Sequence, residues 1–244
     1  MKNLLLALPL LTAGFSSAAT ITANGTPTRT TNAPSIVMPS AAGTDWGLWG
    51  TNGASVPGGA SITSSSGTQT FEVTTIGGAG TPVTRGSGSL AETRFNYSNG
   101  DPTISDTNLQ VGGIFNSGGI GGATANLNSG VALSLTSIAT PVRINLYTYI
   151  YESTARLNVY VGDAVDPAYT NTFTDDNNGK AGYIYTFDYD PGGTPASLRF
   201  EYVKTVSFHD NSNVGFTGIS IVPEPSSVAL LGAGAVAGLL RRKR

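Results

Sequence analysis

The sequence contains no cysteine, and this absence excludes disulfide bonds, thiolate metal sites and cysteine nucleophiles. It contains a single histidine, His209, so a zinc site built from several histidines cannot form. Charged residues make up only 11% of the chain and the formal net charge is −2, which argues against a basic nucleic-acid-binding protein. No long apolar run with helical spacing occurs in residues 20–221, so a helical body is not expected.

Residues 1–19 have the organisation of a secretory signal peptide. Lys2 provides the basic start, residues 4–15 are mostly apolar, and small residues follow. Ser17 and Ala19 would stand at the −3 and −1 positions of a cleavage site, so signal peptidase is expected to cut after Ala19. A buried N-terminal helix is the alternative, but it does not explain the small-residue finish.

A second uncharged apolar segment covers residues 226–240 and precedes four cations, Arg241, Arg242, Lys243 and Arg244. As a helix it would span roughly 22 Å at about 1.5 Å per residue. This is less than the ~30 Å hydrocarbon core of a bilayer, so we expect a short transmembrane helix that is a marginal permanent anchor. The four cations favour a cytoplasmic end, which places the body across the membrane.

Pro223, Glu224 and Pro225 stand directly before this segment, where the two prolines favour an extended, exposed stretch. The tripeptide, the apolar segment and the basic end together resemble the PEP-CTERM sorting signal of Gram-negative bacteria, over residues 222–244. The resemblance implies an exosortase substrate: a membrane transpeptidase-like enzyme would recognise the tripeptide and remove the apolar segment. It further implies delivery to the cell surface or the extracellular matrix, typically in bacteria that form biofilms. Without residues 1–19 and 222–244 the body has a net charge of about −6, which gives no electrostatic reason to bind nucleic acid or anionic lipid.

Residues 20–221 predict an all-β body. Residues 20–67 form a low-complexity start, rich in Thr, Ala, Ser, Gly and Pro. The remainder alternates polar and apolar residues between turn-forming residues, which is typical of a two-sheet antiparallel sandwich, most simply a jelly roll. A right-handed β-helix is the alternative for such a Gly-, Asn- and Thr-rich exported chain. The expected strands cover residues 68–76, 90–97, 109–115, 130–138, 141–151, 155–161, 183–189, 197–206 and 214–222.

The alternation in residues 141–151 and 155–161, joined by a short turn at residues 152–154, predicts an antiparallel hairpin. Its polar face would carry aromatic rings that stack on sugars, beside side chains that hydrogen-bond to hydroxyls, so polysaccharide is the expected partner. One alternative is that tyrosine is simply a good strand former. Another is that this face packs beneath the N-terminal segment, which would bury the tyrosines. The candidate ligand-binding residues are Tyr147, Tyr149, Tyr151, Tyr160, Arg143, Asn145, Arg156 and Asn158.

Two further possibilities concern acidic residues. Asp175, Asp176 and Asn178 could supply oxygen ligands to a structural calcium ion, with Asp163 and Asp166 nearby, although Asp-Asn-Gly clusters also form ordinary turns. A secreted carbohydrate-active enzyme that uses two carboxylates is the alternative to a non-catalytic protein. Its candidates are the four glutamates of the body, and the sequence pairs no two of them: Glu72, Glu92, Glu152 and Glu201.

Overall fold

The computed structural model describes residues 17–30, 34–50, 60, 62–77, 80–84, 93–101, 105–116, 126–174 and 180–224. Within these ranges the chain is all-β and contains no helix, which confirms the predicted fold class. The strands are β1 (Thr20–Ala23), β2 (Thr28–Arg29), β3 (Ile36–Val37), β4 (Asp45–Leu48), β5 (Ile62–Ser64), β6 (Glu72–Ile76), β7 (Pro82–Thr84), β8 (Arg94–Tyr97), β9 (Gly100–Asp101), β10 (Asp106–Gln110), β11 (Ile114–Asn116), β12 (Gly130–Ile138), β13 (Val142–Tyr151), β14 (Ser153–Val161), β15 (Tyr169–Thr174), β16 (Lys180–Asp190), β17 (Ala196–Ser207) and β18 (Asn213–Pro223).

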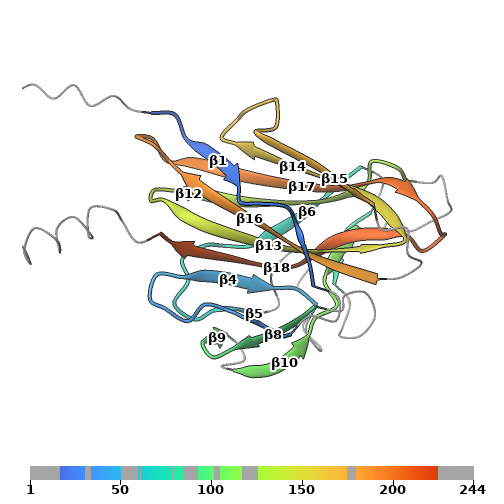
Figure 1. Cartoon of the computed structure of the whole chain (residues 1–244), viewed down its shortest axis with the longest axis horizontal. Helices are drawn as coiled ribbons and strands as arrows, with labels where there is room; N and C mark the ends of the chain where they lie inside the picture. The colour runs from blue at the N-terminus through green and yellow to red at the C-terminus, as the bar shows by residue number, and fades with distance from the viewer. Residues whose placement is uncertain are drawn as a thin grey trace, which may run out of the picture.

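The strands from β11 to β18 build a jelly roll. A 10-stranded sheet contains the order β11-β18-β13-β16, and a 5-stranded sheet contains the order β15-β14-β17-β12. All these pairs are antiparallel, and the chain changes sheet at almost every step (Figure 1). Two four-stranded sheets connected in this way are the double-Greek-key arrangement of a jelly roll. The predicted sandwich is therefore confirmed, and the β-helix is not what forms.

Strict alternation of side chains builds the core between the two sheets. In β13, Ile144 and Leu146 point inward, and in β14, Leu157 and Val159 do the same; all four are fully buried. Each strand thus gives one face to the core, as a period of two requires. The opposite face of each sheet is then free to meet solvent or another layer.

A third layer covers the outer face of the larger sheet. The 3-stranded sheet β10-β8-β3 lies below that sheet in Figure 1, on the side away from β14 and β17. Between them is a second apolar cluster, which includes Trp46, Phe95 and Tyr147. Trp49, three residues after Trp46, instead belongs to the core between the two sheets. The low-complexity start of the body therefore contributes strands to both the 10-stranded and the 3-stranded sheet. It also contributes a buried tryptophan to each of the two apolar clusters.

The predicted hairpin between residues 141–151 and 155–161 is wrong. β13 pairs with β16 and β18, whereas β14 pairs with β15 and β17, so the two strands belong to different sheets. The chain crosses between the sheets at Glu152, which has a positive φ of 45°. Alternation identified both strands and their faces, but it carries no information about which strand lies beside which.

The two ends of the described body lie on the same side of the molecule, although β16 and β13 separate β1 from β18. β1 begins and β18 ends at the same end of the sandwich (Figure 1). The cleavage predicted after Ala19 would make Thr20, the first residue of β1, the start of the processed chain. No helix within the described ranges has the length and apolarity to cross a membrane. Most of the predicted signal peptide, and the apolar segment 226–240 with its cations, lie outside those ranges.

Candidate functional site

The predicted tyrosine face is not an exposed surface. Tyr147 and Tyr149 have exposed fractions of 4% and 0%. The ring of Tyr147 meets Phe95 of the small sheet, and Tyr149 packs with Phe115. The alternative in which this face is covered is the one observed, and the covering residues include Met38, Trp46, Leu48 and Ile62 of the N-terminal segment.

The other residues of this prediction are divided between two faces. Tyr151, Arg143 and Asn145 lie on β13 with Tyr147, where Asn145 donates to the Ser220 hydroxyl. Tyr160, Asn158 and Arg156 lie on β14, on the outer face of the 5-stranded sheet. Because β13 and β14 are on opposite sides of the core, the structure does not bring these residues together as one binding surface.

An open hollow of about 350 Å³ lies on the outer side of the 5-stranded sheet. Its lining comes from three separate parts of the chain: β12, the connection after β14, and β17. The lining residues are Ser134, Gly162, Asp163, Ala164, Ser197, Leu198 and Arg199. Arg199 is not among the residues predicted to bind a ligand, although the apolar residues Leu198, Phe200 and Tyr202 of β17 predict that it points away from the core.

Arg199 links this hollow to Tyr160. Its guanidinium carbon lies 4.4 Å from the centre of the Tyr160 ring, and its Nη1 lies 3.1 Å from Oε1 of Glu201. Burial, together with the charge of Glu201, raises the pKa of the Tyr160 hydroxyl above its ordinary value of 10. Asn158 continues the polar row, since its Oδ1 accepts a hydrogen bond from Thr170 at 3.1 Å. The result is a group of ordered donors and acceptors on a rigid sheet.

The glutamates do not form a paired catalytic site among the described residues. Glu72 and Glu201 share the outer face of the 5-stranded sheet, but β12 lies between their strands. Glu152 is buried at the sheet crossing, where its Oε2 lies 3.4 Å from Nδ1 of His209. Glu92 lies outside the described residues. Among the glutamates that the structure describes, none lies beside Glu201, which instead pairs with Arg199.

The predicted calcium ligands Asp175, Asp176 and Asn178 lie outside the described residues, so that site stays a prediction. Of the two nearby acids, Asp163 lines the hollow. The described part of the chain contains no group of three or more His, Asp and Glu residues able to hold a metal ion.

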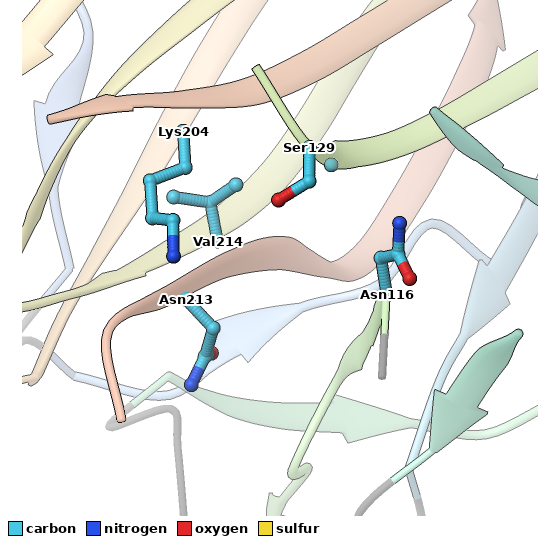
Figure 2. A pocket seen from close by; sticks show the side chains of 6 residues that line it. Asn116, Ser129, Lys204, Asn213 and Val214 are labelled. Carbon is cyan, nitrogen blue, oxygen red and sulfur yellow. The ribbon is translucent and has the colours of Figure 1, made fainter. Parts of the chain in front are cut away.

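A second, much smaller cavity of about 10 Å³ lies between the sheets at the end where Lys204 is buried. Figure 2 shows the Lys204 side chain extending from β17 toward Asn213 of β18. Its Nζ donates to the Ser212 carbonyl at 3.1 Å. Burial lowers the pKa of the Lys204 amine, because the charged form is poorly solvated there. The volume suits one water molecule, so we interpret this cavity as structural.

The sorting tripeptide is continuous with the fold. Pro223 is the last residue of β18 and pairs with Val142 of β13. The next backbone N–H, that of Glu224, donates to the Pro141 carbonyl at 3.1 Å, and Glu224 Oε1 lies 3.6 Å from Nη2 of Arg143. Pro225 and the residues after it lie outside the described ranges.

Comparison with known proteins gives one match. Residues 222–244 match the PEP-CTERM protein-sorting motif, which confirms the resemblance identified from the sequence. No curated protein and no solved structure matched the chain. The motif implies processing by an exosortase, and it marks the chain as an exported protein that is sorted to the cell surface in Gram-negative bacteria.

Proposed function

We propose that this chain is a non-catalytic protein of the cell surface or extracellular matrix whose jelly-roll body binds polysaccharide in the hollow beside Arg199. The observation that carries the proposal is the hollow itself, about 350 Å³ in volume and open to solvent. Binding pockets for small ligands typically have about 300–1,000 Å³, so the hollow is large enough for a sugar unit of a longer chain.

The chemistry of the lining supports a sugar rather than an apolar ligand. Ser134, Ser197 and Asp163 supply hydroxyl and carboxylate oxygens, which accept hydrogen bonds from sugar hydroxyls. The Arg199 side chain is 48% exposed, and a guanidinium can donate several hydrogen bonds from one plane. Its contacts with Tyr160 and Glu201 hold that plane in place, so less conformational entropy is lost when a ligand binds.

This proposal replaces the tyrosine-stacking mode with one based on hydrogen bonds. Tyr160 is only 9% exposed and Arg199 lies over its ring, so the ring acts by fixing Arg199. A sorted, acidic protein with such a site would hold itself to secreted polysaccharide outside the cell. No catalytic step is part of the proposal.

The test is a binding measurement with the purified processed protein and polysaccharide isolated from the producing cells. Arg199→Ala should weaken binding roughly 10- to 150-fold, because the loss of a charge-assisted hydrogen bond corresponds to roughly 1.5–3 kcal/mol. Arg94→Ala, which removes an exposed arginine on the small sheet, is the matched control and should bind as the wild type does. Equal binding by wild type and Arg199→Ala would contradict the proposed site. Depolymerisation of the polysaccharide, abolished by Glu201→Gln, would contradict the non-catalytic assignment.

A further inference from the structure

We infer that Arg143 holds the acidic residue of the sorting signal against the folded body, and that exosortase processing requires this contact to open. The inference concerns the sorting step and is independent of polysaccharide binding. It rests on the position of Glu224, whose carboxylate and backbone both contact β13 or the residue just before it.

No free linker separates the sorting tripeptide from the folded body. Register pairing between β13 and β18 continues through Arg143 with Val222 and Val142 with Pro223. The backbone N–H of Glu224 then continues the pattern by donating to Pro141. The apolar segment begins at Ser226, two residues after Glu224. An enzyme at the membrane surface therefore meets a tripeptide that begins inside a sheet.

A group of ion pairs holds the Glu224 carboxylate. Arg143 Nε lies 2.8 Å from Asp188 Oδ1, and its Nη2 lies 3.6 Å from Glu224 Oε1. Asn24 also donates to Asp188, at 3.3 Å. The hydrogen bond and charge of Arg143 lower the pKa of the Asp188 carboxyl, which is a second anionic partner of the same guanidinium. One arginine thus bridges β16 and the end of β18.

An enzyme that recognises the sorting tripeptide needs access to its backbone and to the Glu224 side chain. A peptide whose N–H and carboxylate are both engaged by its own protein cannot present those groups to an active site. The end of β18 must detach first, and ends of strands open with small free energies. When opening is fast compared with cleavage, the processing rate follows the population of the open form. Arg143 lowers that population, and so slows processing.

The experiment measures the rate at which the full-length precursor is converted to the processed form in pulse-labelled cells. Arg143→Ala should convert about two- to fivefold faster than wild type, because an exposed ion pair contributes at most about 1 kcal/mol. Arg143→Glu should be at least as fast, since it repels Glu224. Arg143→Lys, which retains the charge, should stay close to wild type.

Asp188→Asn is the matched control. It removes the neighbouring ion pair of Arg143 but leaves Arg143 free to hold Glu224, so conversion should not accelerate. The inference is overturned if Asp188→Asn accelerates conversion as much as Arg143→Ala, because general loosening would then explain both. It is also overturned if Arg143→Ala and Arg143→Glu are converted at the wild-type rate or more slowly, which would indicate that the enzyme uses Arg143 itself. These outcomes do not depend on whether the processed protein binds polysaccharide.

Discussion

The ring of Tyr147 meets the ring of Phe95 edge-on, with 5.2 Å between the ring centres. Tyr147 belongs to β13 of the larger sheet and Phe95 to β8 of the small sheet, so this contact joins the two layers. The Tyr147 hydroxyl lies 3.3 Å from the Ser220 hydroxyl, which gives its polar end a partner within the buried cluster. The contact explains why a strand face rich in tyrosine is an interlayer surface here and not a ligand platform.

Removal of this contact should destabilise the protein. Tyr147→Ala is expected to lower the free energy of unfolding by about 3–5 kcal/mol, the usual cost of deleting a buried aromatic side chain. Tyr147→Phe, which loses only the hydroxyl contact, should lower it by about 0.5–1.5 kcal/mol. Denaturant unfolding of the purified processed protein measures both. A loss below about 1 kcal/mol for Tyr147→Ala would show that the small sheet does not cover β13 as described.

The sheet crossing at Glu152 gives a second prediction. Its positive φ of 45° suits asparagine and penalises β-branched residues. Glu152→Asn and Glu152→Val both remove the carboxylate that faces His209, so their difference isolates the backbone effect. The valine variant should be less stable than the asparagine variant by about 1–2 kcal/mol. Thermal unfolding of the two variants provides the comparison, and equal stability would contradict the positive φ.

Buried Lys204 predicts a specific dependence of stability on pH. Its pKa in the folded protein is lowered from the ordinary value of 10.5, so between those two values the unfolded chain binds more protons. The contribution of Lys204 to the free energy of unfolding therefore rises with pH between its pKa in the folded protein and its pKa in the unfolded chain. The unfolding free energy of wild type minus that of Lys204→Met should become more favourable to wild type as the pH rises toward 10.5, the ordinary pKa of lysine. The subtraction cancels the tyrosines, which titrate in both proteins, and a constant difference would contradict the burial.

Local pattern predicted the long strands β12–β14 and β16–β18 well and their neighbours poorly. It did not predict β15 or the short strands before β6, and the single strand predicted over residues 109–115 is wrong, because β10 ends and β11 begins there, in two different sheets. Residues 130–138 have the predicted bounds of a strand, and β13 and β14 both lie where alternation placed them. Alternation depends only on which side of a strand meets the core, so it is visible in one segment. Pairing depends on the rest of the chain and on the turn at Glu152. The left-handed backbone of this turn could not be predicted, because glutamate is not a residue type that favours it.

For the candidate sites too, features within one segment could be predicted, and features that depend on strand pairing could not. The sorting motif is a continuous stretch, and its residues could be identified directly from the sequence. The hollow joins Ser134, Asp163 and Arg199, which become neighbours only through the pairing of β12 and β17 and the connection after β14. The contact of Arg143 with Glu224 similarly requires the register of β13 against β18. No pattern within a single segment of the sequence predicts that these residues lie close together.

The most direct test of the account is the fate of the Glu224→Ala variant in the producing bacterium, followed by cell fractionation and mass measurement. Wild-type protein should reach the cell surface in a form shortened at its C-terminal side, because the sorting motif at residues 222–244 is processed. Glu224→Ala should stay in the inner membrane as a longer form. Recovery of Glu224→Ala at the cell surface with the mass of the wild-type product would contradict the account.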